Sequence, residues 1–153
     1  YTIEGPLHLG AILGGCKQDI LKGISAYSIP VGIAFQIQDD ILGIFGDEKK
    51  IGKEVGSDIE EGKVTILVVK AREKANREQK KMLNELLGKE NLTLREIESF
   101  RKVIRETGSL EYAQKLSLNY IEKGKRALDK IEMKKETKDF LLGMADYMIQ
   151  REV

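Results

Sequence analysis

The sequence predicts an all-α protein, and three observations support this fold class. Only two prolines, Pro6 and Pro30, interrupt the 153 residues. Apolar residues recur at helical spacing through most of the chain, while few segments show the alternation of strands. Glycines and Ser/Thr-x-x-Glu pairs separate the apolar runs, as is typical where helices end and begin. We therefore expect a bundle of helices, with 41% hydrophobic residues to supply its core.

The composition limits the classes of function. With 26 lysines and arginines against 25 acids, the net charge of +1 provides no overall field to attract nucleic acid or an anionic membrane. The single cysteine, Cys16, has apolar neighbours and is expected to be a buried, reduced thiol. No segment approaches the roughly 18 uninterrupted apolar residues of a membrane span, and no basic-then-apolar signal opens the chain. A cytoplasmic protein without a nucleic-acid partner is expected.

The first helix is expected over residues 6–13, ending at the Gly14-Gly15 pair. The second is expected over residues 19–45, with a kink at Pro30. Between residues 46 and 62 the apolar pattern stops and four glycines alternate with lysines and acids. That segment is predicted to be a loop.

Ser57 and Glu60 have capping-box spacing and predict a further helix from Ser57. Its apolar side would comprise Val64, Leu67, Val68 and Ala71. Four more helices are expected, at residues 77–87, 93–106, 109–130 and 134–149. Thr93 and Glu96 form another capping box. The charged faces of these later helices are interpreted as solvated faces around a bundle core, without a binding role.

The informative segment is the end of the second helix, residues 33–45. On a helix, Gln36, Asp39, Asp40 and Gly43 fall within one arc of about 100°. Apolar side chains fill the rest, apart from Gln38. A helix that is apolar almost all round is normally buried, so this stripe is predicted to face a cavity inside the protein.

Two adjacent carboxylates in such a cavity need a compensating cation. Asp39 and Asp40 would otherwise repel each other and take up protons. Oxygen-only ligands suit hard divalent cations, and magnesium typically combines one or two carboxylates with waters and a substrate's phosphates. The stripe thus indicates a metal with a phosphorylated ligand. The alternative is an ion pair with a lysine or arginine of another helix.

The glycine-rich segment contains lysines that could bind the phosphates of this ligand. Lys53, Lys63 and Asp58 flank the expected helix start at Ser57, where free amides and the helix dipole favour an anion. Lysines bind phosphate as point charges, which suits a metal-chelated diphosphate. The alternative is a glycine-rich loop without a ligand.

Together these residues resemble a known family. The run Phe35-Gln36-Ile37-Gln38-Asp39-Asp40-Ile41-Leu42 precedes Gly46-Asp47, Gly52-Lys53, Gly56-Ser57-Asp58 and Gly62-Lys63. This order resembles the second aspartate-rich region of trans-isoprenyl diphosphate synthases, the polyprenyl synthetases, such as archaeal and bacterial geranylgeranyl or farnesyl diphosphate synthases. The resemblance implies an isoprenoid-synthase helical bundle. Residues 1–153 would be a single partial domain, the C-terminal half of that fold.

The resemblance also implies the site. The ligands of magnesium, or of manganese in its place, would be Asp39, Asp40 and Asp58, with Asp58 supporting the hydrated metal. Catalysis would involve Lys53 and Lys63, which hold the allylic diphosphate, and Gln36, which lies near the reacting double bond. Substrate contacts would include Lys53, Lys63, Gln36, Phe35 and Arg151, with Arg151 near the isopentenyl site. Gly43 stands where the family usually has a third aspartate.

The family's reaction condenses isopentenyl diphosphate with an allylic diphosphate after metal-triggered ionisation. The departing diphosphate accepts the proton, so His8 is expected to be structural. Implied partners are the two diphosphates and a second copy in a homodimer. The first aspartate-rich motif would lie upstream, so these residues alone are expected to be inactive. Gly43 and the missing first motif keep one alternative open, a non-catalytic or regulatory subunit of a heteromeric synthase. A second alternative is a terpene cyclase, which shares the metal-triggered ionisation but needs no isopentenyl diphosphate.

Overall fold

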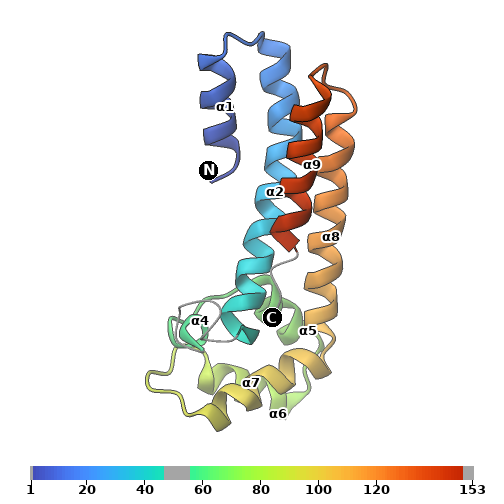
Figure 1. The fold of residues 1–153 in the computed structure, drawn as a ribbon. Coiled ribbons are helices and arrows are strands. Elements are labelled where there is room, and N and C mark those ends of the chain that lie inside the picture. The colour runs from blue at the N-terminus through green and yellow to red at the C-terminus, as the bar shows by residue number, and fades with distance from the viewer. Residues whose placement is uncertain (1, 47–55, 150–153) are drawn as a thin grey trace. The chain divides into compact units, whose positions relative to one another are not determined.

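The computed structural model describes residues 2–46 and 56–149, and their regular structure is entirely helical, as predicted (Figure 1). The helices are α1 (Glu4–Leu13), α2 (Gln18–Phe45), α4 (Ser57–Glu60), α5 (Ile66–Lys74), α6 (Arg77–Leu86), α7 (Leu94–Glu106), α8 (Ser109–Leu128) and α9 (Lys135–Ile149). The chain forms two compact units. The first is Tyr1–Gln36 with Leu116–Arg151, and the second is Ile37–Lys115 with Glu152–Val153. The expectation of one partial domain stays a prediction.

Most helix ends lie within two residues of their predicted positions, because local sequence determines them. The capping box of α7 is confirmed. The Thr93 hydroxyl accepts a hydrogen bond from the Glu96 amide at 3.3 Å, and the Glu96 carboxylate accepts one from the Thr93 amide at 2.9 Å. An unpredicted box of the same kind begins α6, where Asn76 and Gln79 exchange hydrogen bonds.

The helix predicted from Ser57 is wrong in length and in its cap. It stops at Glu60, and α5 begins only at Ile66. The break is at Gly62, whose φ of +69° is a left-handed conformation that helices use to end. The N-cap is Gly56, without a side-chain hydrogen bond, so Ser57 caps nothing. Val64 is 61% exposed rather than apolar core.

The first unit has its core where α2 meets α8 and α9, which run beside it in Figure 1. The core residues are Ile3, Tyr27, Val31, Ala34, Ile121, Leu128, Ile131, Leu141 and Ala145. Two glycines permit close packing. A Cβ on Gly23 would lie 2.6 Å from Cγ1 of Ile131, and one on Gly124 would lie 3.0 Å from the carbonyl oxygen of Tyr27. The Ile131 side chain therefore packs on the backbone of α2 at Gly23, and α8 approaches the backbone of α2 at Gly124.

Helix α2 is also long and apolar enough, by length and composition, to cross a membrane. The mean hydropathy of its most apolar 18-residue window is 1.3. Core helices of soluble proteins pass the same test, and Tyr27, Val31 and Ala34 of this helix are almost fully buried within the first unit. The absence of a membrane span stays a prediction.

The turn between α1 and α2 is more exposed than predicted. Cys16 is half-buried, not buried, because it follows the Gly14-Gly15 turn at the tip of the α1–α2 hairpin. On α1, Leu9, Ile12 and Leu13 are 60%, 56% and 80% exposed. These apolar residues are themselves exposed and thus do not bury the Cys16 thiol.

Tyr27 gives the first unit a testable pH dependence. Its hydroxyl donates a 2.6 Å hydrogen bond to the Leu141 carbonyl. Burial, and to a lesser extent the Asp146 carboxylate, raise the pKa of Tyr27 to about 12, from 10.0. Because the folded-state pKa is the higher one, this stabilisation is complete below about pH 10 and is lost as the pH rises toward 12.

We expect Tyr27→Phe to lower the free energy of unfolding at pH 8 by about 1 kcal/mol, since the Leu141 carbonyl loses its donor. The variant should also lose less stability than wild type between pH 9 and 11. Denaturant titrations at several pH values measure both effects, with Tyr147→Phe, at a side chain 65% exposed, as control. Parallel pH profiles for wild type and Tyr27→Phe would contradict the prediction.

Candidate functional site

The polar stripe of α2 is present but less enclosed than predicted. Asp39, Asp40 and Gly43 are half-buried and Gln36 is exposed. The opposite side is apolar and buried, comprising Ile37, Ile41, Leu42, Ile44 and Phe45. The prediction that the apolar side chains of residues 33–45 are buried is wrong at Ile33. This side chain is 38% exposed and lines a pocket.

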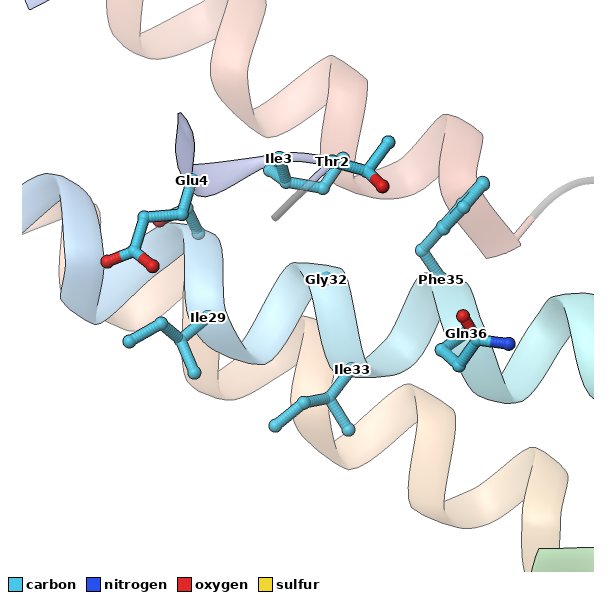
Figure 2. A pocket seen from close by; sticks show the side chains of 9 residues that line it. Thr2, Ile3, Glu4, Ile29, Gly32, Ile33, Phe35 and Gln36 are labelled. Atoms are coloured by element: carbon cyan, nitrogen blue, oxygen red, sulfur yellow. The ribbon is translucent and has the colours of Figure 1, made fainter. Parts of the chain in front are cut away.

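That pocket lies in the first unit and has a volume of about 410 Å³. Its walls are Thr2, Ile3, Glu4, Ser28, Ile29, Gly32, Ile33, Phe35 and Gln36. Figure 2 shows the first turn of the chain facing α2, along which Gly32, Phe35 and Gln36 follow one another. The volume is within the range of small-molecule sites. Both α2 residues predicted to contact substrate, Phe35 and Gln36, therefore line one cavity.

In the second unit, Asp58 of α4 packs directly on the α2 stripe at Gly43. A Cβ on Gly43 would lie 2.5 Å from Cγ of Asp58 and 3.2 Å from its Cβ. Real contacts of a Cβ are wider than this, so the Asp58 side chain occupies the space of a side chain at position 43. Asp58 is only 5% exposed. The second predicted metal-ligand segment is thus in contact with the first.

Lys63 neutralises this buried carboxylate. Its Nζ donates to Oδ1 of Asp58 at 2.6 Å and lies 2.9 Å from Oε2 of Glu61. The hydrogen bond to Asp58, followed by that to Glu61, raises the pKa of the Lys63 ammonium. The Lys63 side chain is 39% exposed, so its charge remains accessible to a ligand.

Contacts with α7 and with the segment that precedes it hold α4 in place. The Gly88 amide donates to the Ile59 carbonyl at 2.8 Å, and the Leu92 amide donates to the Glu60 carboxylate at 2.7 Å. Gly56 has a φ of +84°, and a Cβ there would lie 2.7 Å from Cδ1 of Ile97. These contacts hold α4, which carries Asp58, against α7 and the segment before it.

Arg101 is a residue that sequence reasoning missed. Its Nε donates to the Ile44 carbonyl at 2.6 Å, and Nη1 pairs with Glu98 at 2.6 Å. The guanidinium of Arg105 lies 4.9 Å from the centroid of the Phe45 ring. Arg101 thus places a cation and a donor at the C-terminus of α2, where helix carbonyls lack partners. No local pattern predicts this contact, which spans 57 positions.

His8 makes contacts of a structural kind. Its Nε2 lies 3.1 Å from the Leu21 carbonyl oxygen and 2.9 Å from the Ser25 hydroxyl. Both partners belong to α2, so the imidazole joins α1 to α2. The same nitrogen makes both contacts, and no described contact orients the ring through its other nitrogen as a catalytic base requires.

The donor set fits magnesium. Asp39, Asp40 and Asp58 offer only carboxylate oxygens, and all three belong to the second unit. Within the described part of the chain, no three His, Cys, Asp or Glu residues are clustered closely enough to enclose a metal ion. Magnesium takes only one or two carboxylates and completes its shell with waters and phosphates, so a preformed cage is not required. Two predicted substrate contacts, Lys53 and Arg151, lie outside the described residues.

The sequence matches the polyprenyl synthetase family over residues 1–105. It is 40% identical over 144 residues to geranylgeranyl diphosphate synthases of Methanosarcina mazei and Saccharolobus solfataricus, covering 94% of this chain in both cases. The chain spans 42% and 43% of the length of these two relatives.

Solved structures agree. A geranylgeranyl pyrophosphate synthase from Corynebacterium glutamicum, complexed with isoprenyl diphosphate and magnesium, has a TM-score of 0.94 at 34% identity, over 99% of this chain and 43% of that one. A polyprenyl synthase from Caulobacter crescentus, complexed with calcium and isoprenyl diphosphate, has a TM-score of 0.85 at 25% identity, over 95% and 44%. The fold is that of the all-α isoprenyl diphosphate synthases. The chain belongs to the polyprenyl synthetase family.

Proposed function

We propose that this chain forms part of a prenyltransferase that condenses isopentenyl diphosphate with an allylic diphosphate. The observation that carries the proposal is the contact between the α2 stripe and α4. Through this contact Asp58, with its partner Lys63, lies against Gly43 on the α2 stripe. The predicted metal ligands Asp39, Asp40 and Asp58 and the phosphate-binding candidate Lys63 all belong to the second unit. Family membership and the isoprenyl diphosphates bound by the solved relatives support the choice of substrates.

The carboxylates and lysines have separate tasks in this function. Asp39 and Asp40 would hold magnesium, or manganese, and Asp58 would accept hydrogen bonds from its waters. When bound, the metal stabilises the negative charge of the departing diphosphate. Lys63, with Lys53, binds that diphosphate as it accumulates charge.

The pocket residues serve the organic part of the substrates. Phe35 offers apolar surface to the allylic chain, and Gln36 offers an amide beside the reacting carbons. Arg151 binds the isopentenyl diphosphate. The departing diphosphate accepts the proton lost after condensation, so this function requires no protein base and leaves His8 its structural contacts.

The remaining expectations concern the whole protein. We propose that it is a cytoplasmic homodimer whose first aspartate-rich motif supplies the opposite metal-binding wall. Residues 1–153 alone would then be inactive. This function involves no nucleic acid, which is consistent with a net charge of only +1.

The test is turnover by the purified full-length protein with labelled isopentenyl diphosphate, an allylic diphosphate and magnesium. A longer isoprenyl diphosphate, absent when a chelator is added, is the expected product. Cyclic products from an allylic diphosphate alone would identify a terpene cyclase instead. Turnover that requires a second, different protein would identify a regulatory or non-catalytic subunit, the alternative suggested by Gly43.

A further inference from the structure

The last turn of α2 contains no lysine or arginine of its own. Its residues are Leu42, Gly43, Ile44 and Phe45. The carbonyl groups at a helix C-terminus lack intrahelical donors and carry the negative end of the helix dipole. In an α-helix each amide donates to the carbonyl four residues earlier, so the turn that ends at Ile44 begins at Asp40. Fraying of this turn would therefore move a predicted metal ligand.

Arg101 of α7 supplies the cation and the donor that this turn lacks. Its Nε donates to the Ile44 carbonyl at 2.6 Å, and its Nη2 lies 3.5 Å from the Gly46 carbonyl oxygen. The third nitrogen, Nη1, donates to the Glu98 carboxylate at 2.6 Å, which orients the guanidinium on its own helix. The Arg101 side chain is only 14% exposed. Its hydrogen bonds are therefore partly shielded from water, where charge-assisted bonds are strongest.

Helix α7 is a firm base for this contact. A capping box fixes its first turn, and it packs against α5 and α6. At the Ile97 side chain, α7 also meets the backbone of Gly56, which begins α4. One helix thus contacts both elements that carry predicted metal ligands, which are α2 with Asp39 and Asp40 and α4 with Asp58.

We propose that Arg101 is a positioning residue of the metal-diphosphate site, which holds the end of α2 on α7 and so keeps Asp39 and Asp40 in the orientation that binds the metal. The inference rests on the proposed function, because it takes these two carboxylates as magnesium ligands. It assigns a task to a residue outside both segments on which the family resemblance is based. In this role Arg101 contacts neither metal nor substrate and acts only through α2.

A purely structural cap would have a different effect. It would stabilise the folded protein but leave the metal affinity of the folded molecules unchanged. A positioning residue changes that affinity even where the protein is fully folded, because a misplaced ligand binds the metal less well. Metal binding by folded protein therefore distinguishes the two roles of Arg101.

The experiment measures the binding of Mn²⁺ to the full-length protein in the presence of inorganic diphosphate, by the electron paramagnetic resonance signal of free Mn²⁺. Arg101→Gln, which removes the charge and shortens the donor, should weaken Mn²⁺ binding about tenfold, a usual effect for residues that orient metal ligands. The matched control is Lys102→Gln, which removes the same charge from the next position of α7, at a side chain 72% exposed. It should change binding less than about twofold, because exposed charges are screened.

Arg101→Lys separates the geometry from the charge. The ammonium keeps the charge at the end of α2 but lacks the planar group that donates to Ile44 and Glu98 together. Mn²⁺ binding should weaken about threefold. Circular dichroism verifies folding, and wild-type affinity in a folded Arg101→Gln variant would overturn the inference, as would an equal loss in Lys102→Gln. If Arg101→Gln does not fold, Arg101→Lys decides the question, and wild-type affinity in that variant overturns the inference.

Turnover of the same preparations separates the two proposals. Condensation by wild type together with unchanged Mn²⁺ binding in Arg101→Gln would remove this inference and leave the proposed function. Weaker Mn²⁺ binding in Arg101→Gln, in a protein that does not condense the two diphosphates, would leave Arg101 as a residue that positions a metal site and remove the proposed function.

Discussion

Replacing Asp39 by alanine is expected to lower magnesium-dependent condensation by the full-length protein at least about a hundredfold. Asp39 begins the carboxylate pair on α2, one turn before Gly43 and its contact with Asp58. Removing a metal ligand weakens the stabilisation of charge that develops only as the diphosphate departs. The turnover number should therefore fall more than the apparent affinity for the allylic diphosphate.

The matched control is Asp19→Ala in the first turn of the same helix, where the side chain is 93% exposed and distant in sequence from the stripe. It should retain activity within about twofold, as expected for an exposed surface position. Steady-state kinetics at saturating magnesium, with circular dichroism to verify folding, measure both variants. Condensation that persists in Asp39→Ala at the wild-type rate would remove the metal role of Asp39 and with it the basis of the proposed function.

The fold was predictable where one segment determines its own structure. Helix α7 is an example, since Thr93 and Glu96 form its cap without help from any distant residue. The helix from Ser57 was mispredicted because the Ser-x-x-Glu pattern does not by itself make Ser57 the N-cap, which is Gly56 in the structure. The backbone at Gly56 is left-handed and packs against Ile97, a contact that no local pattern contains.

The site divides in the same way. Helical periodicity alone places Asp39 and Asp40 on one stripe, and the structure keeps them half-buried there. The contact between Gly43 and Asp58 and the cap that Arg101 provides at Ile44 join segments 15 and 57 positions apart. Such contacts depend on tertiary packing. The sequence pattern identified Gly43 and Asp58 as site residues but not their contact, and it did not identify Arg101 at all.

The largest effect on stability is expected from Gly124→Ala in α8. An added methyl group would lie 2.7 Å from Cγ2 of Val31 and 3.0 Å from the Tyr27 carbonyl oxygen. Neither neighbour can move cheaply, because Val31 is buried in the core and the carbonyl belongs to the backbone of α2. We expect the free energy of unfolding to fall by about 2 kcal/mol, the usual cost of overpacking.

Gly143→Ala in α9 is the control, since a Cβ there would have nothing within 4 Å. Both glycines lie inside helices, where alanine is intrinsically better by about 1 kcal/mol, so Gly143→Ala should stabilise the protein by up to that amount. Denaturant titration of both variants tests whether the two substitutions change the free energy of unfolding in opposite directions. Equal stabilisation by the two substitutions would show that α8 does not approach α2 as closely as Gly124 permits, because helix propensity alone would then account for both.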